Sequence, residues 1–154
     1  MKDKIWIAIA TAGPLGYTPR APGTAGSIPG IFIGAWLQHP PGPVPRWLYV
    51  FTVLFFLSGI AIKAIDTTES IWQKHDDRKI VIDEVIGQSL VSAFVPLTWQ
   101  WLALSFIVFR IFDIWKPWPI NVIDRRMTGA LGTLLDDIFA ALAALACLFF
   151  VKWL

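Results

Sequence analysis

Charged residues are scarce in this 154-residue sequence: Asp, Glu, Lys and Arg make up 16% of it, whereas hydrophobic residues make up 56%. Ordinary soluble domains carry roughly 25% charged residues, so this balance argues against a freely soluble globule. The 13 basic and 11 acidic residues leave a net charge of +2, which is too small to favour nucleic acid as a partner. The length suits one domain over residues 1–154, so any chemistry must lie within or beside the apolar part.

Cysteine and histidine are nearly absent. The single cysteine, Cys147, excludes an intramolecular disulfide and a metal site built from thiolates. We interpret it as a small core residue, because it lies in an apolar stretch without the arginine-bearing loop that a thiol phosphatase needs. Chemistry through a phosphohistidine has at most one candidate, because His39 is expected on the outer side and His75 lies in a charged loop.

Long apolar runs are the main feature that is present. A transmembrane helix needs about 20 apolar residues, and four stretches are candidates: residues 47–65, 80–95, 97–115 and 138–154. Tryptophan near an end of the first, third and fourth is typical of a membrane interface. The second is short, and Pro96 after it predicts a tight helical hairpin. The pattern predicts an all-α, polytopic membrane bundle with four spans.

The N-terminal part adds weaker elements. Residues 5–12 predict a short apolar helix, which we favour over a signal peptide because the apolar part is minimal. Residues 13–27 contain too much glycine and proline for a regular helix and predict a structured loop. The loop leads into residues 28–37, which either span or re-enter the membrane, with Ser27 as N-cap and Pro29 in the first turn.

Basic residues predict the orientation. If the loop 66–79 is cytoplasmic, alternating spans place residues 1–27 and 116–137 on the same side. Eleven Lys and Arg residues then lie on the cytoplasmic side, against only Arg46 and Lys152 on the other. This bias follows the positive-inside rule.

Carboxylates gather at the same predicted ends of the helices. Asp83-Glu84 lie near the start of one helix and Asp136-Asp137 at the start of the last, with Asp113 and Asp124 between them in sequence. Charges in apolar helices are costly unless paired or hydrated, so their common level predicts one polar pocket. Adjacent carboxylates repel unless a cation lies between them, and Mg²⁺ prefers oxygen ligands. The alternative is that each pair only interacts with a helix dipole.

Arg110, Asp113 and Lys116 recur every three residues and therefore lie roughly along one helix face. Arg110 is suited to bind two oxygens of a phosphate. The alternative is a local pair with Asp113 and an interfacial lysine. The segment with Thr24 and Ser27 offers backbone donors and hydroxyls to an anion at a helix start, or a simple cap.

Four motifs carry a resemblance to a known family. They are APGTAGS at residues 21–27, IVIDEVIG at 80–87, FRIFDIWKPWPI at 109–120 and LDD at 135–137. In this order, within a match from about residue 13 to 141, they resemble the phosphatidylglycerophosphatase A family. The sequence departs from the family at Gly129-Ala130, where Gly-Gly is usual, and at Ala140-Ala141, where Ala-Gly is usual. None of these residues can bind a metal, so only local packing is affected.

The resemblance implies a Mg²⁺-dependent enzyme of the bacterial inner membrane. Together with the predicted spans and the bias of basic residues, we expect a multi-pass protein with its active site facing the cytoplasm. Its reaction would remove the terminal phosphate of phosphatidylglycerophosphate and leave phosphatidylglycerol. The substrate is a membrane phospholipid, and we infer no obligate protein partner. We assign Asp83, Glu84, Asp136 and Asp137 to metal binding and water activation, Arg110 and Lys116 to the phosphate, Thr24 and Ser27 to secondary phosphate contacts, and keep Asp113 and Asp124 as further candidates.

Two other classes stay open. A lipid phosphotransferase would use similar carboxylates and Mg²⁺, although the spaced aspartate, glycine and Ala-Arg signature of alcohol phosphatidyltransferases is absent. A subunit of an ion-coupled transporter would also hold intramembrane carboxylates, although at least one of them should lie near the bilayer midplane. Which carboxylate acts as base or nucleophile is not determined by the sequence.

Overall fold

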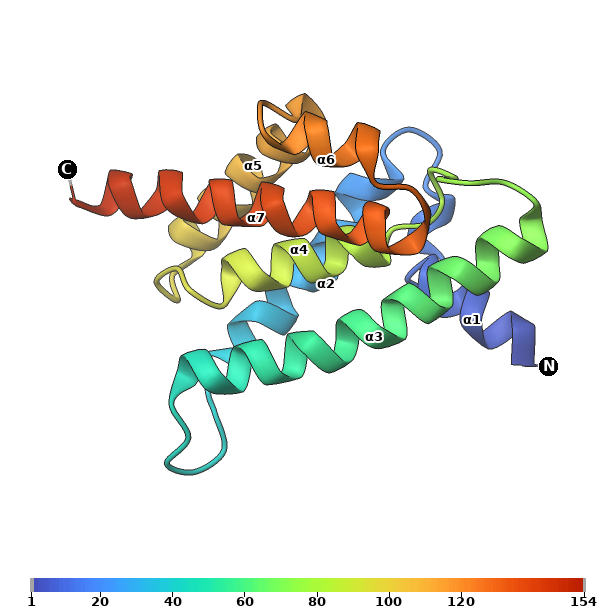
Figure 1. The fold of residues 1–154 in the computed structure, drawn as a ribbon. Coiled ribbons are helices and arrows are strands. Elements are labelled where there is room, and N and C mark those ends of the chain that lie inside the picture. Colours follow the sequence, from blue (N-terminus) through green and yellow to red (C-terminus); the bar gives the residue numbers. More distant parts are fainter. Residues whose placement is uncertain (1, 154) are drawn as a thin grey trace.

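The computed structural model describes residues 2–153, and over this range the chain is helical without a strand (Figure 1). The prediction of an all-α fold is therefore confirmed. The elements in chain order are α1 (Lys2–Ala10), the short 3-10 helix η1 (Leu15–Tyr17), α2 (Pro22–Leu37), α3 (Arg46–Trp72), α4 (Ile82–Ser92), α5 (Trp99–Trp115), α6 (Ile120–Arg126) and α7 (Gly129–Trp153).

Helix α4 lies at the centre of the bundle. It packs against α2, α3, α5 and α7, and its residues from Val85 to Ser92 are all buried. Eleven residues at about 1.5 Å each reach about 16 Å, roughly half of a bilayer's hydrocarbon layer. The predicted span at residues 80–95 is thus a short, protein-enclosed helix, although the predicted hairpin to α5 through Pro96 is present.

Helices α3 and α7 are long and apolar enough to cross a membrane, over Arg46–Trp72 and Gly129–Lys152. Large apolar side chains cover their outer surfaces, including Phe55 at 74% and Phe150 at 68% exposed. Such surfaces are unusual in soluble monomers and suit contact with lipid. These two helices indicate a membrane protein. The other two of the four predicted spans are not confirmed.

Helix α2 begins earlier than the sequence predicts. Pro22 occupies the first turn, where its missing N–H costs nothing, and Pro29 lies inside the helix. Ser27 is therefore not the N-cap; it is fully buried one turn into the helix, and its hydroxyl donates to the carbonyl oxygen of Gly23 at 2.9 Å. The expectation of a loop up to residue 27 was wrong from residue 22 onwards.

The glycines of α2 explain this difference. A Cβ atom on Gly30 would lie 2.6 Å from the carbonyl oxygen of Val85, and one on Gly34 would lie 2.5 Å from that of Ser89. The absence of side chains lets the backbones of α2 and α4 approach closely. Tertiary packing thereby outweighs the low helix propensity of glycine, and it brings the first turns of α2 and α4 together.

Helix α7 also begins earlier, at Gly129 instead of residue 138. Asp136 and Asp137 therefore lie inside the helix and not at its start. Cys147 is exposed on the surface of α7, so the interpretation as a core residue was wrong. Its ten-residue separation from Asp137 corresponds to about 15 Å along the helix. The substituted pair Ala140-Ala141 is fully buried, in keeping with a role in packing.

Candidate active site

A polar cavity of about 450 Å³ lies where the helix ends meet. The first turns of α2 and α4, the end of α5, the N-terminal part of α7 and the loop before α4 form its walls. Nine of the ten predicted site residues line it, and Ser27 is the exception; the nine are Thr24, Asp83, Glu84, Arg110, Asp113, Lys116, Asp124, Asp136 and Asp137. The structure thus brings together side chains that are up to 113 positions apart in sequence, as the shared level of the carboxylates predicted.

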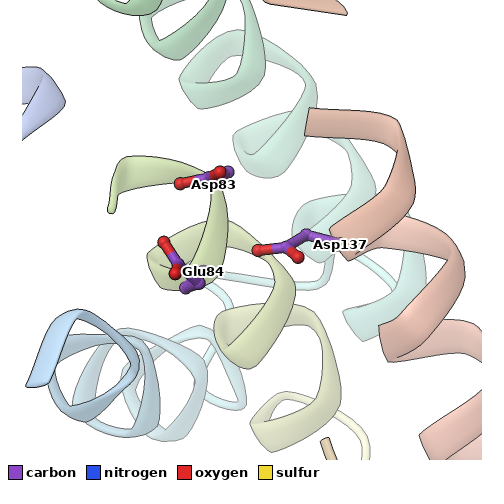
Figure 2. Close-up of side chains that lie close together, drawn as sticks. All are labelled: Asp83, Glu84 and Asp137. Atoms are coloured by element: carbon purple, nitrogen blue, oxygen red, sulfur yellow. The ribbon is translucent and has the colours of Figure 1, made fainter. Parts of the chain in front are cut away.

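Three of the carboxylates form a compact group. Asp83 and Glu84 come from the first turn of α4, and Asp137 extends toward them from α7 (Figure 2). Each offers an oxygen, and these oxygens lie within 4.8 Å of one another. Asp83 and Asp137 are only 7% and 3% exposed, so water screens their mutual repulsion poorly.

The same group contains oxygens without a partner. Asp83 Oδ1, Glu84 Oε2 and Asp137 Oδ2 are buried and accept no hydrogen bond from any of residues 2–153. Buried carboxylate oxygens are costly in this state unless a cation or a donor satisfies them. Three clustered carboxylates are the hard oxygen ligands that Mg²⁺ prefers. The residues therefore fit the divalent metal that the sequence resemblance implies.

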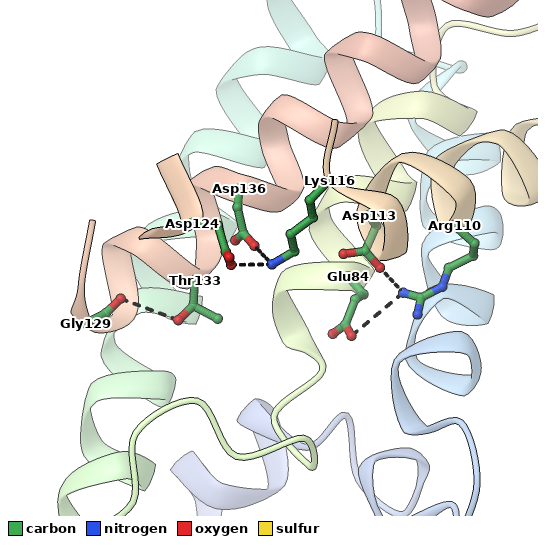
Figure 3. A network of polar contacts seen from close by, with 8 residues as sticks. All are labelled: Glu84, Arg110, Asp113, Lys116, Asp124, Gly129, Thr133 and Asp136. Carbon is green, nitrogen blue, oxygen red and sulfur yellow. Dashed lines mark hydrogen bonds and ion pairs between the residues drawn. The ribbon is translucent and has the colours of Figure 1, made fainter. Parts of the chain in front are cut away.

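Arg110 lies beside Glu84 of this group (Figure 3). Its Nη1 forms an ion pair with Asp113, one helical turn further along α5, and lies 3.8 Å from Glu84 Oε1. The local Arg110–Asp113 pair considered above is thus present. Arg110 Nε and Nη1 are buried and make no hydrogen bond with the described residues, and the side chain lines the cavity.

Gly23 leaves the space that Glu84 occupies. The sequence analysis did not assign this role to Gly23. A Cβ atom on Gly23 would lie 2.1 Å from Glu84 Oε1 and 3.1 Å from Arg110 Nη2. Only a residue without a side chain leaves this space to the carboxylate. The sequence feature that could have indicated this role is the glycine itself, which belongs to the APGTAGS motif. We interpreted that motif as backbone that binds an anion.

Lys116 ends α5 in a left-handed conformation, with φ of 44°, and forms ion pairs with Asp124 and Asp136 (Figure 3). Burial disfavours its charge, but the hydrogen bonds from its ammonium to Asp124 and Asp136 outweigh this and raise the pKa of Lys116 above its ordinary value. Asp136 is thus engaged by Lys116, outside the compact group of three carboxylates. The lysine connects α5, α6 and α7 around the cavity.

Further residues of the cavity wall were missed. Arg20, Arg78 and Thr133 line it, and so does His75, whose Nδ1 lies 2.8 Å from Glu69 Oε1. The loops that carry Arg20, His75 and Arg78 have no periodicity from which their position could be inferred. His75 was noted only as a residue of a charged loop.

The fold and the cavity define a helical membrane protein whose buried carboxylates and arginine suit chemistry on a phosphate group. The chain belongs to the phosphatidylglycerophosphatase A family, whose sequence profile matches residues 8–152. The resemblance carried by the four motifs is confirmed, and the chain is an enzyme, a phosphatase of lipid metabolism.

Individual relatives agree with this. The chain is 34% identical over 147 residues to phosphatidylglycerophosphatase A of Escherichia coli K12, covering 95% of this chain and 83% of the relative. It is 37% identical over 139 residues to the same-named protein of Haemophilus influenzae, covering 90% and 83%. A relative from Bacteroides thetaiotaomicron, 30% identical over 152 residues and covering 96% and 93%, is named provisionally as a phosphatidylinositol-3-phosphatase. No solved structure matches the chain.

Proposed function

We propose that this enzyme is a Mg²⁺-dependent phosphatase of the bacterial inner membrane that hydrolyses the terminal phosphate of phosphatidylglycerophosphate at the cytoplasmic face. The products are phosphatidylglycerol and phosphate. The observation that carries the proposal is the group of Asp83, Glu84 and Asp137 beside Arg110, in a cavity at one end of apolar helices. The names of the relatives from Escherichia coli and Haemophilus influenzae support the substrate.

The residues divide the work as follows. Asp83, Glu84 and Asp137 would hold Mg²⁺, which when bound supplies positive charge against the negative charge that develops on the phosphoryl oxygens. Arg110, which lines the cavity, binds the phosphoryl oxygens that do not react. In the reaction, the oxygen of water forms a bond to phosphorus and the ester P–O bond breaks. The attacking water loses one proton and the departing alkoxide takes one up, so no net proton is gained or lost.

Lys116 has a structural role here, whereas the sequence analysis assigned it to phosphate binding. Because Asp124 and Asp136 already engage its ammonium, we assign it to fixing α6 and α7 at the cavity. Thr24 lines the cavity and remains a candidate for phosphate contact. Ser27 is removed from this set, because its hydroxyl is buried against the carbonyl of Gly23.

Phosphate release by the protein purified in detergent tests the proposal. The substrates are phosphatidylglycerophosphate, phosphatidylinositol 3-phosphate and phosphatidic acid, each with Mg²⁺, with EDTA, and with EDTA followed by excess Mg²⁺. We expect release chiefly from phosphatidylglycerophosphate, lost in EDTA and restored by Mg²⁺. Faster hydrolysis of phosphatidylinositol 3-phosphate would contradict the substrate, and undiminished release in EDTA would contradict the metal.

The metal site itself is tested by Asp137→Asn. The amide keeps the shape of the side chain but removes the ligand charge, so Mg²⁺-dependent release should fall by about a hundredfold or more, beyond the usual effect of residues that only support metal ligands. Asp66→Asn is the matched control, because Asp66 is exposed on α3 and outside the cavity wall. Both variants should melt in detergent near the wild-type temperature. Full activity of Asp137→Asn would remove Asp137 from the metal site.

A further inference from the structure

An apolar groove of about 470 Å³ lies between α2 and α5, on the outer surface of the bundle. Its wall is formed by Thr24 of α2 and by one face of α5; the α5 residues are Phe106, Ile107, Arg110, Ile111, Ile114 and Trp115. We propose that this groove receives an acyl chain of the lipid substrate, so that the phosphate group enters the polar cavity sideways from the bilayer. The inference rests on the proposed function as a lipid phosphatase.

Continuity with the polar cavity is the first argument. Thr24, Arg110 and Ile114 line both the groove and the cavity. A lipid whose terminal phosphate lies in the cavity therefore has an apolar surface that begins at the wall of that cavity, and the glycerol phosphodiester of its headgroup can bridge from the phosphate to an acyl chain in the groove. Arg110 lies at the point where the apolar wall of the groove meets the wall of carboxylates, so a headgroup that reaches from the groove to the carboxylates passes this residue.

The surface around the groove is the second argument. Ile107, Ile111, Ile114 and Trp115 of the groove wall are 53%, 50%, 71% and 74% exposed. Residues 2–153 leave half or more of each of these side chains uncovered, and such an apolar surface suits lipid. An acyl chain can therefore pass from the bilayer into the groove without crossing a polar surface.

A second apolar groove provides the comparison. It lies between α3, α4 and α7, is larger at about 690 Å³, and shares no lining residue with the polar cavity. Volume alone would favour it for a lipid chain. The second groove is nonetheless the poorer candidate, because it does not adjoin the polar cavity. The phosphate and the acyl chain belong to one molecule and must be bound at the same time.

Photo-crosslinking tests the position directly and does not require turnover. Phosphatidylglycerophosphate with a diazirine in one acyl chain is irradiated with the wild-type protein in nanodiscs of phosphatidylcholine, and labelled peptides are identified by mass spectrometry. We expect label on residues 106–115 that unlabelled phosphatidylglycerophosphate competes away and added phosphatidylcholine does not. Competed label on α3 and α7 instead, or no competed label, would overturn the proposal.

Kinetics provide the second test. Ile111→Trp fills the groove at a half-exposed position and should raise KM for a dioleoyl substrate about tenfold, with little change for a water-soluble dibutanoyl analogue. Leu142→Trp, in the wall of the second groove, is the control and should change neither. Equal losses on both substrates, no loss on either, or a larger loss from Leu142→Trp would contradict the groove. Failure of the proposed function would look different, because the wild type would then hydrolyse neither substrate.

Discussion

At the scale of single residues, the cost of charge in an apolar chain made the site predictable. Asp83-Glu84 and Asp136-Asp137 stand out in the sequence because carboxylates next to long apolar runs are costly unless they are paired or hydrated. The division between Asp136 and Asp137 was not predictable. Consecutive residues of a helix point in directions about 100° apart, so their partners depend on how α7 is rotated, and only the structure shows Asp136 with Lys116.

Arg110 is the residue where two interpretations predict different kinetics. Arg110→Lys keeps the charge but replaces two coplanar donors by a single flexible ammonium. If the guanidinium binds the phosphate, the loss of this contact should cost about 2 to 4 kcal/mol, by analogy with other preorganised donors. At about 1.36 kcal/mol per tenfold change, kcat/KM should fall roughly thirty-fold to a thousand-fold.

Asp113→Asn provides the comparison, because Asp113 forms the ion pair with Arg110 in the structure. If that pair only holds the end of α5, lysine should replace arginine with little kinetic loss, and Asp113→Asn should reproduce whatever loss occurs. The measurements are kcat/KM for both variants and their melting temperatures in detergent. Near-normal catalysis by Arg110→Lys would remove the arginine from phosphate binding.

At the scale of elements, one error was to exclude residues 22–27 from a helix. Glycine and proline there break helices in isolation, but in this chain Gly26, Gly30 and Gly34 provide the surface on which α4 packs. The spacing of four residues from each of these glycines to the next was visible in the sequence. What was not visible was the partner helix that makes the spacing favourable.

This packing predicts that Gly30→Ala destabilises the protein. The added Cβ would lie 2.6 Å from the carbonyl oxygen of Val85, and backbone atoms cannot move aside as a flexible side chain can. Overpacking of this kind costs about 1 to 3 kcal/mol, so the melting temperature in detergent should fall. Gly59→Ala on α3 is the matched control, because a Cβ atom there meets nothing within 4 Å. It should leave stability unchanged or raise it by up to about 1 kcal/mol. Equal melting temperatures for the two variants would contradict the close packing of α2 on α4.

At the scale of the whole molecule, the sequence predicted where the polar end lies better than it predicted the number of spans. Alternating apolar segments and the bias of basic residues place the carboxylates at one end, and the cavity is found where helix ends from α2, α4 and α5 meet. Apolar length is a poor guide to spans when a helix is enclosed by others. Helix α4 is apolar because α2, α3, α5 and α7 surround it, and this reason is independent of the bilayer.

The orientation of the molecule in the membrane stays a prediction with a direct test. In a Cys147→Ala background, single cysteines at Ser70 and Thr128 would report on the cavity end, and one at His39 on the opposite end; all three positions are exposed. With eleven of the 13 Lys and Arg residues on the predicted cytoplasmic side, the positive-inside rule predicts that the cavity end faces the cytoplasm.

In intact spheroplasts an impermeant thiol reagent should therefore label His39→Cys and spare Ser70→Cys and Thr128→Cys. All three should react after detergent lysis, which shows that protection comes from the membrane and not from the fold. The reverse pattern before lysis would place the cavity on the outer face and contradict the proposed cytoplasmic site.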